Sequence, residues 1–356
     1  MMNGLKSDRM KLLESELYKQ DLELAVKKIN LSNLDGKSIF ITGGLGLICS
    51  AVVDLLLTYG KTGSIYVAAR NAEQFVARYG GINKVVFIKY DALDELNIIE
   101  TPDYIIHGAG LASPELYTSK PVETILSNFD GVHALLNFAK TNHVKRVLYI
   151  SSSEVYGKKR SEKPFEEGTY GEIDIDNIRS SYAIAKRASE MLCKSYCLEY
   201  GVDIVIARPG HIYGPSSKQN DKRVSSDFAF RAAFGDKIVM KSSGIQKRSY
   251  CYSIDCALQI LTILLKGECG QAYNIGHDEI TTIRKMATII AQAGNVELEI
   301  SDPTENDIKD FNPMNNSALN NDKIKKLGYV DTFTVEEGLT HTVKILKEIS
   351  RSSNDL

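Results

Sequence analysis

One stretch constrains the fold of this 356-residue chain more than any other: an apolar strand that runs directly into closely spaced glycines. Ile39–Ile41 is followed at once by the sequence TGGLGLIC at 42–49, and a helical pattern continues over Ala51–Tyr59. Gly43 permits a tight turn and Gly46 a close approach to a phosphate, while a cysteine replaces the third glycine usual in such loops. The strand–loop–helix context therefore predicts binding of a dinucleotide pyrophosphate at the helix N-terminus.

Strand-like and helical segments alternate beyond this loop. Strands are predicted at Ser38–Thr42, Ser64–Ala69, Lys84–Lys89, Asp103–His107, Arg146–Ser151 and Val202–Ala207, and longer helices at Val122–Thr141 and Ser180–Tyr200. We predict an α/β fold, a Rossmann-type doubly wound parallel sheet with a smaller C-terminal α/β substrate lobe. The expected divisions are a helical N-terminal extension (1–35), a dinucleotide-binding domain (36–208) and a mainly substrate-binding lobe (209–350), with some exchange of strands and helices between the last two.

Composition excludes several classes of protein. The 43 basic and 45 acidic residues nearly cancel, so no global field attracts nucleic acid or an anionic membrane. No apolar stretch reaches the roughly 18–20 residues of a membrane span, and the charged segment Met1–Lys28 lacks the core of a secretory signal. The six cysteines have no histidine cluster beside them to complete a metal site. We expect a cytoplasmic protein with reduced thiols and no metal, nucleic-acid or membrane partner.

The second predicted strand bears on the choice of cofactor. An acidic residue at its end would bind the ribose 2′-hydroxyl of NAD, but this strand ends in Arg70. Arg70 suits the 2′-phosphate of NADP, stacking on adenine, or a solvated position on the surface. Asp91, after the third strand, is a candidate acceptor for the adenine amino group. NAD is the expected cofactor, with NADP the alternative.

A second group of polar residues indicates chemistry. Tyr182 and Lys186 are four apart on a predicted helix and share one face. A lysine ammonium beside a phenol favours the phenolate and predicts a lowered tyrosine pKa. About thirty residues earlier, the strand that ends in Ser151-Ser152-Ser153-Glu154 supplies hydroxyls and a carboxylate at the carboxyl edge of the sheet, where doubly wound folds bind ligands.

Together these motifs resemble the extended short-chain dehydrogenase/reductase family of nucleotide-sugar epimerases, dehydratases and decarboxylases, over roughly residues 37–346. The resemblance implies that Tyr182 is the general base, that Lys186 holds the nicotinamide ribose, and that Ser152 binds the sugar hydroxyl being oxidised. Besides Gly43, Gly46, Arg70, Asp91, Tyr182 and Lys186, the cofactor contacts expected by motif position are Leu47, Ile48, Ala109, Gly110 and Asn128.

The residues around Glu154 favour one branch of that family. The 4,6-dehydratases typically have aspartate where Ser153 stands, whereas Ser-Glu-Val-Tyr-Gly resembles the UDP-glucuronate decarboxylases. This likeness implies a catalytic Glu154 and an Arg248 near the sugar carboxylate, although relatives also use an arginine there to clamp diphosphate. The substrate contacts expected by motif position are Ser153, Arg179, His211, Arg223 and Arg248. The family commonly has asparagine where His211 stands.

Several functions remain open on the sequence. The first is decarboxylation of UDP-glucuronate to UDP-xylose through transient oxidation at C4, because a 4-ketone lies β to the carboxylate and allows loss of CO2. The second is an NDP-sugar 4-epimerase or 4,6-dehydratase, and the third a catalytically silent nucleotide-sugar-binding protein. The resemblance also implies a homodimer built on the helices at Val122–Thr141 and Ser180–Tyr200. We expect the N-terminal extension either to pack across the domain or to form an oligomer contact.

Overall fold

The computed structural model describes residues 10–94, 96, 98, 100–159, 161–302 and 316–351. Residues 1–9 of the predicted N-terminal extension and 303–315 of the predicted substrate lobe lie outside the described residues.

Seven parallel strands form the central sheet, in the order β10-β6-β5-β4-β1-β2-β3. Their bounds are β1 (Ile39–Thr42), β2 (Ile65–Ala69), β3 (Val85–Lys89), β4 (Tyr104–His107), β5 (Arg146–Ile150), β6 (Ile204–Pro209) and β10 (Ala272–Ile275). The chain runs outward from β1 to β3 and then from β4 to β10, so the order reverses between β1 and β4. This arrangement confirms the predicted doubly wound sheet, whose ligand crevice lies at the carboxyl ends of the strands around that reversal.

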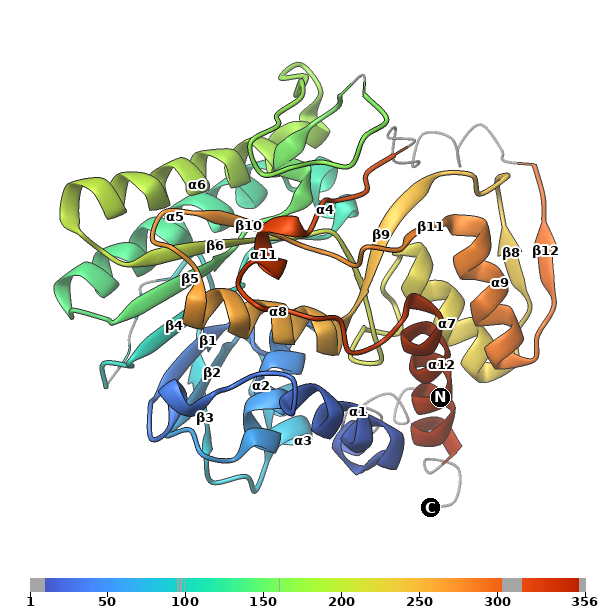
Figure 1. Cartoon of the computed structure of the whole chain (residues 1–356), viewed down its shortest axis with the longest axis horizontal. Coiled ribbons are helices and arrows are strands. Elements are labelled where there is room, and N and C mark those ends of the chain that lie inside the picture. The colour runs from blue at the N-terminus through green and yellow to red at the C-terminus, as the bar shows by residue number, and fades with distance from the viewer. Residues whose placement is uncertain are drawn as a thin grey trace.

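Helices cover both faces of the sheet (Figure 1). Those in and around the sheet are α1 (Glu16–Val26), α2 (Leu47–Tyr59), α3 (Ala72–Tyr79), α4 (Pro114–Ser119), α5 (Pro121–Thr141), α6 (Ser181–Tyr200), α8 (Ser253–Lys266) and α11 (Asp322–Lys325). Helices α5 and α6 lie together on one face, and α2 and α8 on the other. Side chains alternate along β1, because Phe40 joins the core under α5 and α6 while Ile39 and Ile41 join the core under α2 and α8.

Short 3₁₀ turns complete this part of the chain: η2 (Met10–Glu14), η3 (Ser32–Leu34), η4 (Ser153–Tyr156) and η5 (Ile178–Ser180). Of these, η4 and η5 flank the site described below, because η4 follows β5 directly and η5 leads into α6.

The smaller lobe packs beside the carboxyl ends of the large sheet (Figure 1). Its strands are β7 (His211–Tyr213), β8 (Ile238–Met240), β9 (Lys247–Tyr252), β11 (Ile280–Thr282) and β12 (Leu298–Ile300), and its helices are α7 (Val224–Phe234), α9 (Ile283–Gly294) and α12 (Val335–Arg351). Strand β9 pairs with β7 in parallel and with β11 in antiparallel orientation, while β8 and β12 pair separately. Because β10 returns from this segment to the large sheet, the two lobes share one continuous chain path.

Buried polar contacts fix the N-terminal helix α1 across the molecule. The Tyr18 hydroxyl donates to Asp54 Oδ2 of α2 at 2.8 Å. On the same helix Asp21, 1% exposed, accepts a hydrogen bond from the Tyr252 hydroxyl at 3.0 Å and lies 3.0 Å from Nδ1 of His341 in α12. Helix α1 therefore packs against both lobes of its own chain.

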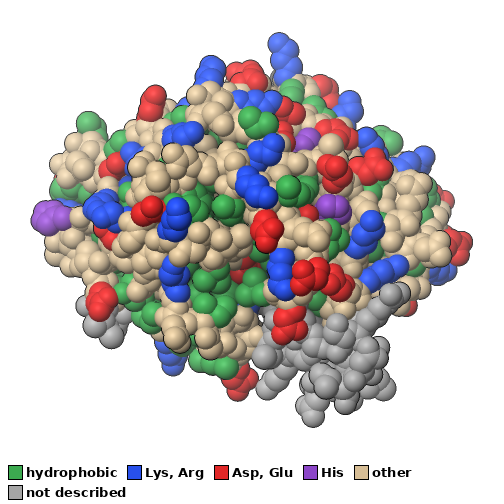
Figure 2. Space-filling view, turned by 60° about the horizontal axis from the view of Figure 1, so that its bottom comes forward, with side chains coloured by type: hydrophobic (Ala, Val, Ile, Leu, Met, Phe, Trp, Pro, Cys, Tyr) green, Lys and Arg blue, Asp and Glu red, His purple; other side chains and the backbone are tan. Residues whose placement is uncertain are grey.

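The surface carries mixed charge. Lys and Arg alternate with Asp and Glu across the face shown in Figure 2, without a broad region of one sign. No helix in the described part of the chain combines the length and the apolar character that a membrane crossing requires.

Candidate active site

The glycine loop joins β1 to α2 in a conformation that only small residues permit. Gly43 has a φ of 68°, and a Cβ there would lie 2.8 Å from the backbone oxygen of Gly108, at the end of β4. Gly46 is the N-cap of α2 and provides no side chain to cap the helix. Leu47 and Ile48 begin the helix, so the backbone N–H groups of its first turn have no side-chain cap. This cradle fits a pyrophosphate.

Cysteine takes the place of the third loop glycine without closing the site. Cys49 is buried in the first turn of α2, and its Sγ lies 2.5 Å from the point that a Cβ on Gly108 would occupy. The larger residue at 49 is therefore accommodated by glycine on the neighbouring strand end.

Thr42 and Asn128 hold the loop after β4 against the glycine loop. The Thr42 Oγ1 accepts hydrogen bonds from the backbone N–H of Gly108 and Ala109. The Asn128 Nδ2 donates to the Leu111 carbonyl at 3.1 Å, and its Oδ1 is buried with no hydrogen-bond partner among the described residues. A Cβ on Gly110 would lie 2.5 Å from that Oδ1. The loop at 108–110 therefore lies close to Asn128, whose Oδ1 remains available to accept a hydrogen bond.

Arg70 and Asp91 lie together at the carboxyl ends of β2 and β3. The Arg70 Nη1 is 3.8 Å from Asp91 Oδ2, and the arginine side chain is 66% exposed. Two strands, β4 and β1, separate β2 from β5, which leads to the serine cluster. This placement suits the adenosine end of a dinucleotide whose pyrophosphate binds at Gly43 and Gly46.

Tyr182 and Lys186 project from the first turns of α6 toward the end of β5. Tyr182 is 5% exposed, and its ring stacks on that of Tyr117 from α4, with 4.4 Å between centroids and 7° between planes. The Ser152 side chain lies near enough to act on the pKa of its hydroxyl. The Lys186 Nζ donates to the Ile150 carbonyl at 2.9 Å.

The predicted lowering of the tyrosine pKa is wrong for the chain by itself. Burial raises the pKa of Tyr182 to about 12, and the nearby Glu154 carboxylate adds to the effect, against the hydrogen bond from Ser152. Lys186 does not offset this burial, because its ammonium is directed to Ile150 and lies 5.7 Å from the centroid of the Tyr182 ring. Burial also lowers the pKa of Lys186, to about 8.

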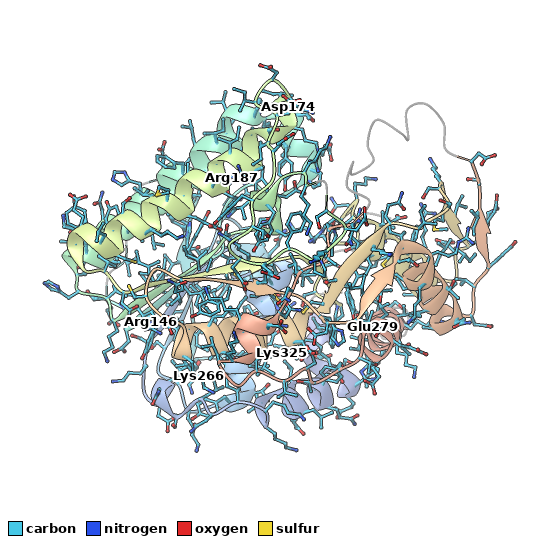
Figure 3. The ribbon with its side chains drawn as sticks, turned by 45° about the horizontal axis from the view of Figure 1, so that its top comes forward. Arg146, Asp174, Arg187, Lys266, Glu279 and Lys325 are labelled. Atoms are coloured by element: carbon cyan, nitrogen blue, oxygen red, sulfur yellow. The ribbon has the colours of Figure 1, made fainter. Side chains whose placement is uncertain are left out.

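The serine cluster forms the turn after β5. Ser152 caps η4, with its Oγ accepting from the Glu154 N–H at 3.2 Å. Ser153 is the first residue of η4, and Glu154 is paired with Arg179 at 3.5 Å between Oε2 and Nη1. Arg187 of α6, labelled in Figure 3, secures the turn by donating to backbone carbonyls at 155, 156 and 171.

The smaller lobe contributes His211, Arg223 and Arg248. They come from β7, from the residue that precedes α7, and from β9. Arg248 is 3% exposed; its burial lowers its pKa, while Tyr250 and Glu154 raise it. Burial, then Arg248 and Arg223, lower the pKa of His211 to about 3. His211 is therefore neutral near pH 7, with a buried Nδ1 that has no hydrogen-bond partner in the described chain.

The structure thus gathers most of the predicted site residues around Tyr182. Mutual electrostatic effects link Tyr182 to Glu154 and Arg223, Glu154 to Arg248, and Arg248 to His211. No cluster of three or more His, Cys, Asp or Glu side chains suited to a metal occurs among the described residues.

Comparison with known proteins gives the family. Residues 39–276 match the model of the NAD dependent epimerase/dehydratase family. The chain belongs to this family. It is 30% identical to UDP-glucuronic acid decarboxylase 1 of Xenopus tropicalis, over 91% of this chain and 76% of the relative, and 33% identical to UDP-glucuronic acid decarboxylase 5 of Arabidopsis thaliana, over 74% and 76%. These matches confirm the predicted membership and an enzyme of the epimerase/dehydratase type.

A solved structure supports the same conclusion. The UDP-glucose 4-epimerase of Thermus thermophilus, in complex with NAD, superposes with a TM-score of 0.73 at 25% identity and covers 87% of this chain and 99% of its own.

Three groups that contact the candidate site residues were not singled out from the sequence. Tyr117 comes from α4, far from Tyr182 in sequence, and no pattern in the residues around it distinguished it. His107 ends β4 beside Thr42, 2.8 Å from its hydroxyl. Glu190, one turn beyond Lys186 on α6, shows the same spacing of four that marked Tyr182 and Lys186, so this signal was present in the sequence.

Proposed function

We propose that this enzyme decarboxylates UDP-glucuronate to UDP-xylose. The observation that carries the proposal is the buried Arg248, which lies near enough to Glu154 for that carboxylate to raise its pKa. A guanidinium beside Glu154 can bind a sugar carboxylate as well as a diphosphate. The decarboxylase relatives, at 30% and 33% identity, support the same substrate.

The residues suit transient oxidation at C4. Ser152 and Tyr182 bind the C4 hydroxyl, and Tyr182 takes its proton in the phenolate form. Because burial raises the pKa of Tyr182 to about 12 in the chain alone, that form requires positive charge beside the ring in the complex. The nicotinamide, when bound, supplies reversible hydride acceptance at this carbon. Lys186 supplies positive charge beneath the site. Arg248 orients the carboxylate β to the resulting ketone, so that loss of CO2 leaves a stabilised enolate, to which Glu154 can relay a proton from water.

NAD is the proposed cofactor. Among the residues singled out from the sequence, Arg70 favours NADP, but it already has the Asp91 carboxylate 3.8 Å away, and that carboxylate would repel a 2′-phosphate. We expect tighter binding of NAD than of NADP in fluorescence titrations. The substitution Asp91→Asn should reduce the difference in affinity between NAD and NADP, and Arg70→Ser should increase it. Tighter binding of NADP to the unmodified protein would contradict this choice.

We propose a homodimer built on α5 and α6. These helices expose apolar side chains that a monomer would leave in water: Val122, Ile125, Leu126, Ile184, Met191 and Leu198, the last 91% exposed. Light scattering should give twice the chain mass, and Leu198→Glu should reduce it, whereas Leu24→Glu on α1 should not. A monomer at micromolar concentration would refute the proposal.

Mass spectrometry of the protein incubated with UDP-glucuronate and NAD tests the reaction. The expected product has lost CO2. Tyr182→Phe should abolish it, and Arg248→Met should reduce it at least 100-fold, while the surface variant Arg231→Met should retain full activity. The decarboxylase proposal fails if neither a CO2-loss product nor reduced cofactor appears.

A 4-epimerase is the second candidate, because the structural neighbour of Thermus thermophilus is one. In that case a C4 epimer of the same mass would appear in place of the decarboxylated sugar. Loss of water would indicate a dehydratase, which the serine at 153 disfavours. Binding without any turnover would indicate a silent binding protein.

A further inference from the structure

Three successive turns of α6 contact three successive residues at the end of β5. Tyr182 lies near the Ser152 side chain, which acts to lower its pKa, and the Lys186 Nζ donates to the Ile150 carbonyl at 2.9 Å. One turn further, Glu190 Oε1 accepts a hydrogen bond from the Ser151 Oγ at 2.6 Å. Residues four apart lie on one face of a helix. Glu190 is therefore the third point that sets the register of this helix against the strand end that bears Ser152.

A buried arginine fixes Glu190 in turn. Arg208, at the end of β6, is fully buried and Glu190 is 5% exposed. The Nε of Arg208 donates to Oε1 at 2.9 Å and its Nη2 to Oε2 at 2.5 Å, a bidentate arrangement with a defined geometry. Arg208 also donates to the hydroxyls of Tyr156 and Tyr170 and to the Glu167 carbonyl. The carboxylate therefore has little freedom to move.

Glu190 is the charged neighbour of Lys186. The other titratable groups around the ammonium are Tyr182 and Cys193 of α6, Cys49 of α2, His107 of β4 and Tyr149 of β5. Burial raises the pKa of both cysteines and both tyrosines, and it lowers that of His107 to about 3. All five are neutral between pH 6 and pH 9. Among the groups named, the Glu190 carboxylate thus supplies the charge that opposes the cost of burying Lys186.

We propose that Glu190 is a positioning residue for the reaction, which holds Ser152 in register with Tyr182 through Ser151 and supplies the counter-charge of the buried Lys186 ammonium. This inference rests on the proposed roles of Tyr182 and Lys186. It adds a residue that reaches neither sugar nor nicotinamide and acts through its neighbours.

The pH dependence of kcat/KM tests the charge role. Glu190 raises the pKa of Lys186, which burial holds at about 8. In Glu190→Gln, Lys186 should lose its proton at lower pH, so the alkaline limb of the profile should move down by about one unit. In Glu190→Asp the limb should return toward its original position although the rate stays reduced. Since Glu190→Gln leaves Arg208 uncompensated, the double variant Glu190→Gln/Arg208→Met removes both buried charges and should show the same shift.

A matched ion pair provides the control. Asp203 and Arg146 join the amino ends of the same two strands, β5 and β6, with 2.8 Å between Oδ2 and Nε, and Figure 3 shows Arg146 away from Arg187 and the site end of α6. Asp203→Asn should leave the profile in place. If it moves the alkaline limb as far as Glu190→Gln does, or if neither Glu190 variant moves it, the positioning role is refuted.

Two further measurements separate this inference from the proposed reaction. Ser151→Ala removes the strand contact and keeps the ion pair, so it should lower kcat without moving the alkaline limb. Titration of Lys186 by NMR in protein labelled with ¹³C-lysine requires no substrate. A lower lysine pKa in the Glu190 variants upholds the charge role even if no nucleotide sugar is turned over, and an unchanged pKa refutes it even if the enzyme is an active decarboxylase.

Discussion

Replacing His107 with asparagine should make this fold less sensitive to acid. His107 is 1% exposed at the end of β4, and its Nδ1 lies 2.8 Å from the Thr42 Oγ1. That oxygen already accepts from the backbone N–H groups of Gly108 and Ala109. Because a hydroxyl has one proton and two acceptor positions, its proton must be donated to Nδ1. A histidine protonated at Nδ1 cannot accept this proton, so acid breaks the contact between His107 and Thr42, whose hydroxyl holds the loop at 108–110.

The pKa of His107 gives the magnitude. Burial, and secondarily the charge of Lys186, lower it from 6.5 to about 3. Above pH 6.5 the ring is neutral in both the folded and the unfolded chain. Between pH 6.5 and pH 3 the unfolded chain binds a proton that the folded chain does not, so the free energy of unfolding falls by about 1.4 kcal/mol per pH unit. At pH 5 the free energy of unfolding should therefore be about 2 kcal/mol lower than above pH 6.5 because of His107 alone.

Urea unfolding at pH 7.5 and pH 5.0 measures the effect. The asparagine Oδ1 can accept from Thr42 but does not titrate, so His107→Asn should lose about 2 kcal/mol less than the unmodified protein between the two pH values. Comparing the two pH values cancels the cost of the smaller side chain. His133→Asn, on the exposed side of α5, should behave as the unmodified protein. An equal loss of stability in His107→Asn and the unmodified protein would refute the reasoning.

Two further predictions concern the glycine loop and the buried ion pair between Asp54 and Arg78. Gly43→Ala should weaken NAD binding more than tenfold in fluorescence titrations, because φ at this residue is 68° and the new methyl would lie 2.8 Å from the Gly108 oxygen. The control Gly168→Ala, with open space around the new methyl, should leave NAD binding unchanged. Asp54→Asn should lower the unfolding free energy by about 3–5 kcal/mol, because it strands the buried Arg78; Asp227→Asn, in an exposed pair, should cost under about 1 kcal/mol in the same thermal or urea unfolding assay.

The first six strands were predictable to within about two residues at either end. Each is a short apolar run between turn-forming or charged residues, and runs of this kind bury both faces in a parallel sheet. Helix α3 was not predicted, because its eight residues span little more than two turns, too few for a repeating apolar pattern to be recognised; of them Phe75, Arg78 and Tyr79 are buried. Strand β10 was also missed, since its four residues include Asn274, whose side chain bonds to backbone carbonyls at 165 and 320.

The candidate site divides in a similar way. The glycine loop, the Tyr182–Lys186 spacing and the serine cluster each have a local signature, since a turn or a helix face alone sets the geometry. Tyr117 has none: its stacking on Tyr182 exists only because α4 and α6 meet over the end of β5. The direction of the Tyr182 pKa was likewise decided by burial and by Glu154, and neither could be weighed against Lys186 before the distances were known.

The sequence by itself determined the first six strands, the dinucleotide loop and the side chains available for chemistry, because these depend on spacing along the chain. Tertiary structure decided which of those side chains act on one another. Glu190 and Arg208 lie 18 residues apart, and His107 lies 65 residues from Thr42, yet each pair is in direct contact. Burial also shifts the pKa of Lys186, His107 and His211, since the cost of removing a charge from water depends on what surrounds it in space.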